Sequence, residues 1–166
     1  MNLRDKNLLL SFLAMFIFSL IGMTFSSIHL NFFAPFLIIC YYQKSYPKAL
    51  QYSILSGCII DLFSSPLRFG IHALNYSLTT ACIYHQKRNL FADNLTTLPL
   101  MTFLFSFVST IIQVILLFIF ATPIALSFTF IFSDLLFMPA MDALFSFCWF
   151  ILPNLFSQQR NHSRSL

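Results

Sequence analysis

"GCIIDLFSSPLRFGIHAL" (Gly57–Leu74) is the stretch that decides how this chain folds. Its two ends are apolar, as helices in a membrane are, whereas its middle carries two serines, a proline and an arginine. The stretch therefore predicts two helices joined by a short turn. Asp61 follows Gly57 by four residues and Ser53 by eight, so all three share one face of the first helix. Small residues at this spacing let a second helix approach closely.

The composition of the whole chain places this hairpin in a membrane. Of 166 residues, 58% are hydrophobic and 8% are charged, and the mean hydropathy is +0.82. A water-soluble domain of this length has too little core to bury so much apolar surface. We expect an all-α integral membrane protein with one polytopic domain over residues 1–156. Residues 157–166 form a polar cytoplasmic tail in this prediction.

Six apolar runs are long enough to serve as membrane-spanning helices. They cover residues 7–25, 28–42, 47–63, 66–84, 98–120 and 137–156. Pro35 should kink or interrupt the second run, whereas Pro47 and Pro66 suit the first turns of the third and fourth. The apolar segment Ala121–Asp134 is short, and a partly immersed or re-entrant path suits it better than a full crossing.

The charges predict the orientation of these spans. With the N-terminus inside, one side of the membrane receives eight basic residues and the other receives only Arg68. The eight are Arg4, Lys6, Lys44, Lys48, Lys87, Arg88, Arg160 and Arg164. Such a bias predicts six spans with both termini in the cytoplasm. The basic residues stand at segment ends rather than on one face, which argues against a nucleic-acid partner.

Two aspartates are candidates for function. An aspartate at the bilayer centre costs about 2.5–3.5 kcal/mol, so we expect Asp61 to have a partner. Arg68 and the N-terminus of the following helix, near Ser65, are the two candidates. Asp61 either fixes the hairpin or belongs to a polar recognition site that faces outward. Asp142 lies within the final apolar run, on one predicted face with Ser146 and Trp149, where it serves function or close packing.

Other polar residues give weaker predictions. The predicted outer half also holds Asp134, His29 and His72, but their spacing is not that of metal ligands, and we expect no metal or cofactor. A polar stripe on the fifth run should pack against other helices, with a ligand path as the alternative. The stripe consists of Thr102, Ser106, Thr110 and Gln113.

Catalytic and disulfide signatures are weak. The four cysteines lie within apolar runs, so we interpret them as small core residues without a disulfide framework. They are Cys40, Cys58, Cys82 and Cys148. The chain has three glycines and no glycine-rich phosphate loop, and no serine nucleophile elbow occurs. We therefore expect a protein that is not an enzyme.

The stretch at 57–74 resembles the bacterial rod shape-determining protein family MreD. That family is similar in having a Gly-x-x-x-Asp pattern at the end of one helix, then a short outer turn, a glycine and an Ala-Leu dipeptide. Here these are Gly57, Asp61, Gly70 and Ala73–Leu74. The last run, "DALFSFCWFILPNLF" (Asp142–Phe156), also resembles the aromatic, proline-containing last span of the family.

The resemblance implies both a fold and a function. The fold would be similar to the six-helix substrate-binding components of energy-coupling-factor transporters. The protein would be a non-catalytic scaffold in the bacterial inner membrane that binds an MreC-like bitopic protein. It would help couple MreB-like filaments to peptidoglycan synthesis by a RodA-like glycosyltransferase and its transpeptidase. The residues expected to shape the hairpin or contact the partner are Gly57, Asp61, Arg68, Gly70 and Asp142.

Two other classes of function remain open from the sequence. The same fold could serve as a vitamin-binding or other small-molecule-binding subunit of a transporter. The polar stripe and three acids would then line a pocket, the acids being Asp61, Asp134 and Asp142. An intramembrane enzyme that depends on Asp61 or Asp142 is the remaining class.

Overall fold

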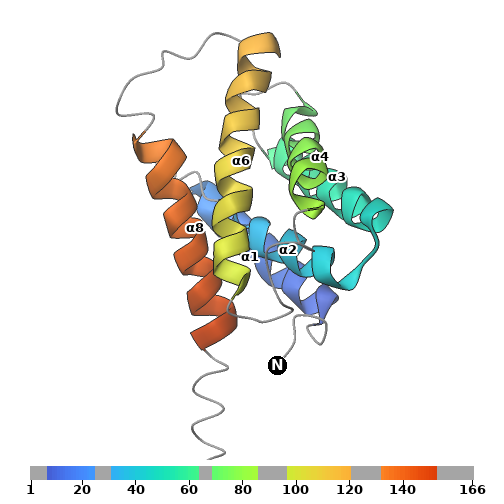
Figure 1. Ribbon diagram of the computed structural model, residues 1–166, viewed down its shortest axis with the longest axis vertical. Coiled ribbons are helices and arrows are strands. Elements are labelled where there is room, and N and C mark those ends of the chain that lie inside the picture. The colour runs from blue at the N-terminus through green and yellow to red at the C-terminus, as the bar shows by residue number, and fades with distance from the viewer. Residues whose placement is uncertain (1–6, 25–30, 64–68, 86–96, 121–131, 153–166) are drawn as a thin grey trace, which may run out of the picture.

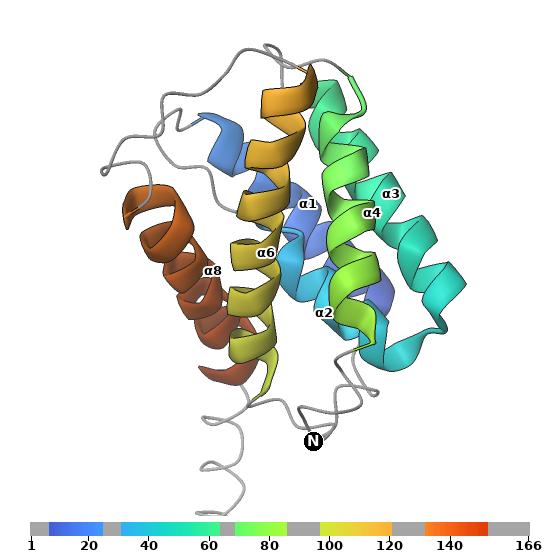
Figure 2. The ribbon, with the colours of Figure 1, turned by 45° about the horizontal axis from the view of Figure 1, so that its top comes forward.

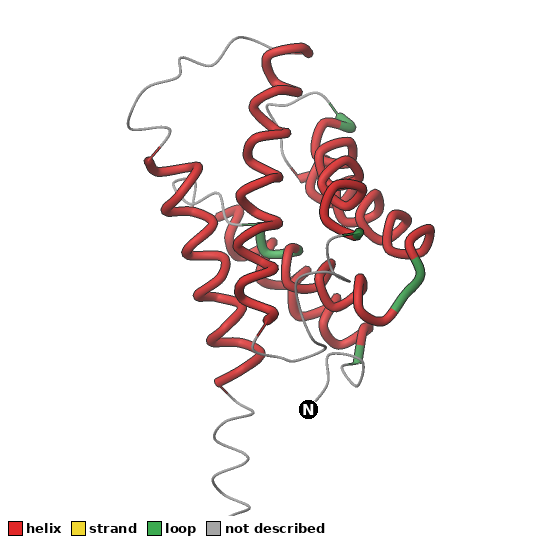
Figure 3. The backbone as a smooth tube through the Cα atoms, viewed as in Figure 1, coloured by secondary structure: helices red, strands yellow, loops and turns green. Residues whose placement is uncertain are grey.

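The computed structural model describes residues 7–24, 31–63, 69–85, 97–120 and 132–152. Within these ranges every regular element is a helix, and the remaining described residues form turns (Figure 3). The all-α class predicted from the sequence is therefore confirmed. The similarity to transporter substrate-binding components stays a prediction.

The helices correspond to the predicted runs, with changes at several ends (Figure 1). Four of them are α1 (Leu8–Thr24), α3 (Tyr46–Phe63), α4 (Ile71–Tyr84) and α6 (Thr97–Phe120). The run at 28–42 gives only the short α2 (Ala34–Gln43). The last helix joins η2 (Ser133–Phe137), α8 (Met138–Ser146) and η3 (Phe147–Ile151).

Proline explains the short second helix. We expected Pro35 to kink or interrupt the run at 28–42, and the run is interrupted rather than kinked; residues 28–30 lie outside the described ranges. Residues 31–33 form a turn, and Pro35 lies in the first turn of α2, where its missing N–H needs no partner. Similarly, α4 begins at Ile71 after a turn at 69–70, later than the predicted start at residue 66.

The last helix begins earlier than predicted and contains two wide π turns. It starts before Asp134, so the last residues of the predicted re-entrant segment belong to this helix. The earlier part of that segment, residues 121–131, lies outside the described ranges. Each π turn ends two residues before a proline of the sequence, Pro139 or Pro153. Proline cannot donate the usual helical hydrogen bond and crowds the carbonyl of the preceding turn, which favours such local widening.

The helices run between two ends of one bundle (Figure 2). We call the end at which α1, α3 and α6 begin the lower end; α2, α4 and the last helix finish there. The opposite, upper end holds the α3–α4 turn and the end of α6. Helices α3 and α4 pack extensively on each other, as do α6 and α8, and α4 also packs on α6.

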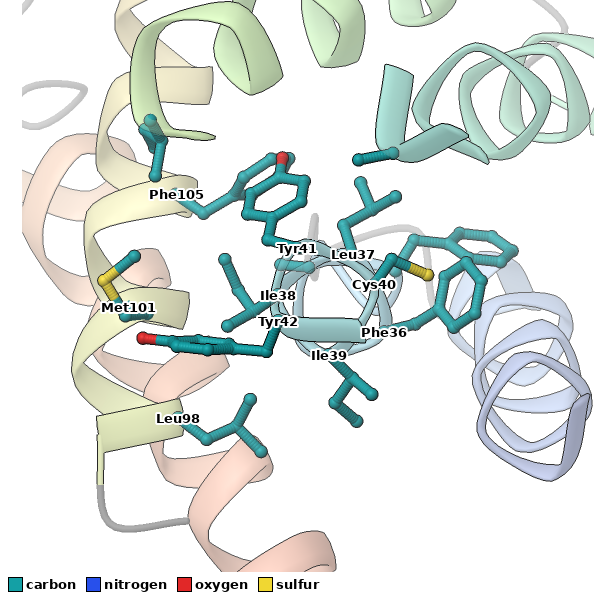
Figure 4. Close-up of a cluster of buried hydrophobic side chains, with 14 of the residues drawn as sticks. Phe36, Leu37, Ile38, Ile39, Cys40, Tyr41, Tyr42, Leu98, Met101 and Phe105 are labelled. Carbon is teal, nitrogen blue, oxygen red and sulfur yellow. The ribbon is translucent and has the colours of Figure 1, made fainter. Parts of the chain in front are cut away.

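The short helix α2 lies at the centre of the packing. Every residue from Ala34 to Tyr42 is buried, and Figure 4 shows α6 side chains, including Met101 and Phe105, on one side of it. Ten helical residues rise about 15 Å, roughly half the apolar thickness of a bilayer. The first turn of α2 therefore lies inside the bundle rather than at one of its ends (Figure 2).

The outside of the bundle is apolar. Two helices, Thr97–Phe120 and Ser133–Ile151, are long and apolar enough to cross a membrane, and only 22% and 28% of these windows is buried. A core helix of a soluble protein would be mostly buried, whereas here side chains such as Phe118 and Leu62 are about 70% exposed. These features indicate a membrane protein. The six-span topology stays a prediction.

Candidate functional site

The α3–α4 hairpin is tightest at Gly57. A Cβ atom built on Gly57 would overlap the backbone of Ala73, lying 2.6 Å from its nitrogen and 2.7 Å from the carbonyl oxygen of His72. The opposing atoms belong to the backbone, so a change of rotamer cannot make room for a side chain. Glycine at this position allows the start of α4 to rest directly on α3, as the spacing of small residues predicted.

Asp61 lies one turn beyond Gly57 and binds the start of α4. Its Oδ1 accepts the backbone N–H of His72 at 3.0 Å, and its Oδ2 accepts that of Ala73 at 3.1 Å. The first N–H groups of a helix have no acceptor within the helix, and the helix dipole makes this end positive. The carboxylate, 7% exposed, thus obtains two backbone donors at the positive end of α4.

Two partners were expected for Asp61, and the structure shows one of them, the N-terminus of the next helix. That helix begins at Ile71, not near Ser65. The other expected partner, Arg68, lies outside the described residues, as does the turn 64–66.

Gly70 adopts the backbone conformation that joins the two helices. It precedes the first residue of α4 with φ of +100°, in the left-handed region that residues with a side chain rarely adopt. Its carbonyl oxygen accepts the N–H of Leu74 at 2.9 Å, which closes the first turn of α4. No atom lies within 4 Å of a Cβ built here, so the need for glycine is conformational rather than steric.

Asp142 forms a second buried carboxylate site. It is 2% exposed; its Oδ1 accepts the backbone N–H of Asn31 at 3.0 Å, and its Oδ2 accepts the hydroxyl of Ser106 at 2.5 Å. Tyr76 of α4 donates to Oδ1 of the Asn31 side chain at 3.2 Å. Asp142 therefore links the last helix to α6 and to the turn before α2, and Asn31 extends the link to α4.

The polar stripe of α6 is directed inward at two of its four positions. Thr102 and Ser106 are buried, and Thr102 Oγ1 lies 3.3 Å from Ser146 Oγ of the last helix. The other two, Thr110 and Gln113, are half-buried, and Thr110 donates to the carbonyl oxygen of Ser106 one turn earlier. The inward prediction is thus confirmed for the half of the stripe that faces Asp142.

Sequence reasoning missed several polar residues between the helices. Asn75 of α4 donates to Ser109 of α6 at 3.0 Å, and both are fully buried. Thr80 Oγ1 and the hydroxyl of Tyr41, on α2, lie 2.7 Å apart. The presence of Asn75 and Thr79 four residues apart in an apolar run was the signal that could have identified this face of α4.

The predicted outer polar residues that the structure describes do not come together in one site. Within the described ranges, Asp61 and Asp142 share no hydrogen-bond partner. Asp134 is half-buried in the first π turn, and His29 lies outside the described residues. Trp149 does not share the face of Asp142 as predicted, because it is 45% exposed and its ring contacts Phe18 of α1 at a centroid distance of 4.7 Å.

An apolar groove of about 450 Å³ lies beside the hairpin, and neither carboxylate lines it, although the lining residue Ala73 donates its N–H to Asp61. It is lined by Ile54 of α3, residues 69–71, 73, 74 and 77 around the start of α4, and Phe120 of α6. The acids and the α6 stripe, which a transporter subunit was expected to use for its ligand, are absent from this lining.

Metal-ligating side chains are dispersed over the described part of the chain. No group of three His, Cys, Asp or Glu residues there could hold a metal ion. The free thiols differ in exposure: Cys40 is buried and Cys58 half-buried, whereas Cys82 and Cys148 are exposed. The prediction of core cysteines is therefore wrong for the last two, which lie on the outer faces of α4 and the last helix.

Comparison with known protein families, with curated proteins and with solved structures finds no match for this chain. The interpretation of the two carboxylate sites therefore rests on their own geometry and on the sequence pattern at 57–74. Both carboxylates hold two parts of the bundle together: Asp61 accepts two backbone N–H groups of α4, whereas Asp142 accepts the backbone N–H of Asn31 and the hydroxyl of Ser106.

Proposed function

We propose that this chain is an MreD-like scaffold in the inner membrane of a bacterium, where it binds an MreC-like bitopic protein. In this role it helps couple MreB-like filaments to peptidoglycan synthesis by a RodA-like glycosyltransferase and its transpeptidase. The α3–α4 hairpin carries the proposal. The residues by which the sequence resembles the family, Gly57, Asp61 and Gly70, are those whose geometry shapes the hairpin.

The arrangement of polar groups supports a scaffold rather than an enzyme. The hydrogen bonds of the buried polar side chains join different segments of the bundle, as those of Asp61, Asp142 and Ser106 do. A catalytic base or nucleophile has to reach a substrate, and none of these side chains is directed into the groove beside the hairpin. A rigid hairpin end with a fixed shape, by contrast, is what a docking partner requires.

The proposed orientation places the lower end in the cytoplasm and the hairpin turn outside. Lys44 and Lys48 belong to the lower end, at the α2–α3 connection, as the excess of positive charge inside requires. Crossing the membrane six times brings both termini to the cytoplasmic side in this proposal. A cysteine introduced at Ser65 should react with an impermeant reagent when only the outer barrier is opened.

Site-specific crosslinking in living cells tests the proposed partner. A photoreactive amino acid should replace exposed residues beside the hairpin turn, Leu62, Phe63 or Phe69, so that the buried carboxylates stay intact. Leu9 of α1 is a control that is equally exposed but lies at the lower end. We expect capture of a bitopic protein from the hairpin positions and not from Leu9.

Depletion of the protein supplies the cellular readout. Cells should lose their rod shape or widen as the elongation machinery loses its scaffold. Normal cell shape after complete depletion, together with no bitopic protein captured from the hairpin, would contradict the proposal. Retention of a small vitamin-like molecule by the purified protein would favour the transporter subunit instead.

A further inference from the structure

The exposed side of α3 is apolar over only part of the helix. Lys48 and Gln51 are exposed in its first two turns, and its exposed apolar side chains beyond them extend from Tyr52 to Phe63. Because a helix rises about 1.5 Å per residue, this apolar part is about 17 Å long. Any tilt of α3 from the membrane normal reduces the apolar height that it presents to lipid.

The neighbouring helix α4 is short as well. Its 14 residues rise about 21 Å in all, and the exposed His85 follows its last residue. The hydrocarbon core of a typical bilayer is about 30 Å thick. This side of the bundle is therefore shorter than the hydrocarbon that would surround it.

The opposite side of the bundle is apolar over a greater height. Every exposed residue of α6, from Leu100 to Phe120, is apolar, and the rise between these two residues is about 30 Å. Every exposed residue of the last helix, from Phe132 to Leu152, is apolar too. Helix α3 and the last helix lie on opposite sides of the bundle (Figures 1 and 2). The two sides therefore fit bilayers of different thickness.

Side-chain flexibility compensates for only part of this difference. The long side chain of Lys48 can carry its charge toward the interface, whereas Gln51, one turn deeper, is too short to reach as far. A bilayer adapts to a short apolar surface by becoming thinner beside it. Exposure of the apolar residues of α3, from Tyr52 to Phe63, leaves this face open to such lipid.

We propose that the bilayer becomes thinner beside α3, so that the lipids on this face have shorter acyl chains than the lipids on α6. The partner of the α3 face is thus a short-chain phospholipid, selected by the length of its chains rather than by its headgroup. The inference rests on the membrane location in the proposed function. It requires neither the proposed orientation nor the protein partner.

Quenching of tryptophan fluorescence by brominated lipids tests the two faces separately. Trp149 is the only tryptophan of the chain, so W149F provides a background without other reporters. In this background, L55W places a reporter on the exposed side of α3, and I111W places one on that of α6. The purified full-length protein is reconstituted in 18-carbon phosphatidylcholine that contains a dibrominated phosphatidylcholine of either 14 or 22 carbons per chain.

The two reporters should give different results. We expect the L55W reporter to favour the 14-carbon lipid over the 22-carbon lipid by about 3-fold or more, and the I111W reporter not to favour it. The same chain-length preference at both reporters would overturn the proposal. So would an L55W reporter that no brominated lipid quenches, because protein rather than lipid would then cover the α3 face.

Lengthening the apolar part of α3 should remove the preference. K48L/Q51L extends it toward the start of the helix by about 6 Å. The preference of the L55W reporter for the 14-carbon lipid should then fall to within about 1.5-fold. An unchanged preference in this variant, with thermal unfolding also unchanged, would contradict the proposal.

A matched variant adds the same number of leucines without lengthening α3. C82L/C148L places them at exposed positions of α4 and the last helix. It should keep the full preference of the L55W reporter, and a loss equal to that of K48L/Q51L would contradict the proposal.

The outcomes also separate this inference from the proposed scaffold. Equal lipid preferences on the two faces, with capture of a bitopic protein from the hairpin, would refute this inference alone. A preference for short chains at α3 without such capture would refute the scaffold and leave the thinned bilayer standing.

Discussion

Asp61 and Asp142 are both buried carboxylates that accept backbone N–H groups, yet the segments they hold differ greatly in distance along the chain. Asp61 binds residues 11 and 12 positions later, within one hairpin, whereas Asp142 binds a residue 111 positions earlier. The hairpin can form as soon as α3 and α4 exist. The Asp142 site requires the last helix, α6 and the turn before α2 to be in place together.

The Asp61 site therefore stabilises one hairpin, whereas the Asp142 site stabilises contacts between distant parts of the chain. The Asp61 site fixes the angle and spacing of two neighbouring helices, and its loss should leave the rest of the bundle intact. The Asp142 site closes the bundle, because it joins the last helix to α6 and to the turn before α2. In each place the donors that the structure describes are backbone and hydroxyl groups held by the bundle, which favour a buried carboxylate.

The largest effect should follow from a side chain at Gly57. In Gly57→Leu the new side chain meets the backbone of Ala73 and forces α3 away from α4, which should lower the free energy of unfolding by about 3 kcal/mol. Titration with a denaturing detergent measures this change. Gly22→Leu is the matched control, since the three atoms nearest to a Cβ there belong to the side chain of Phe32 rather than to backbone, and it should cost less than half as much. Equal losses would refute the backbone contact.

Asp142→Ala should give the next largest effect. The change leaves the N–H of Asn31 and the hydroxyl of Ser106 buried without their acceptor, at a cost of about 2–3 kcal/mol in the free energy of unfolding. Asp142→Asn keeps one acceptor oxygen and should lose about half as much. The half-buried Asp134, changed to alanine, should leave stability within about 0.5 kcal/mol. A full loss in that control would contradict a specific role for Asp142.

Asp61→Ala should cost less, about 1 kcal/mol, which is the usual value of a helix cap. Asp61→Asn keeps one acceptor oxygen, so only one of the N–H groups of His72 and Ala73 retains its partner, and the variant should lose about half as much. The asparagine variant therefore separates shape from recognition. If it keeps most of its stability but loses capture of the bitopic partner at the hairpin, the charge of Asp61 is recognised. If it keeps both, the carboxylate only shapes the hairpin.

Gly70→Ala should have the smallest of these effects, about 1 kcal/mol or less, from the left-handed backbone alone. Gly70→Asn should recover part of this loss, because asparagine tolerates the left-handed region better than alanine. The free energy of unfolding of both variants in detergent measures the difference. An alanine variant as stable as the unmodified protein would show that the turn can adopt another conformation.

Local features of the fold could be predicted from the sequence, whereas contacts between distant segments could not. The spacing of Gly57 and Asp61 predicted a tight hairpin, and the start of the next helix was one of the two partners expected for the carboxylate, because these residues are close in the chain. Asp142 was identified as a buried polar residue, but its donor Asn31 was not. No periodicity in the sequence relates two residues that meet only after the bundle closes.

Hydropathy also did not predict where α2 begins, for a physical reason. A continuous apolar run predicts one long helix, but α2 starts only at Ala34 and is buried within the bundle from there to Tyr42. Burial in protein and burial in lipid select the same residue types. The turn at 31–33 and the placement of Pro35 decided the start of the helix, and hydropathy does not record either.

The enclosed position of α2 has a consequence for biogenesis. The ribosome delivers α2 long before α6 and the last helix, so the helix leaves the insertion machinery without the neighbours that later surround it. Until residue 142 has been synthesised, the N–H of Asn31 has no carboxylate to bind. The packing around α2 therefore stays incomplete during most of translation. Synthesis and docking of the final helix complete it.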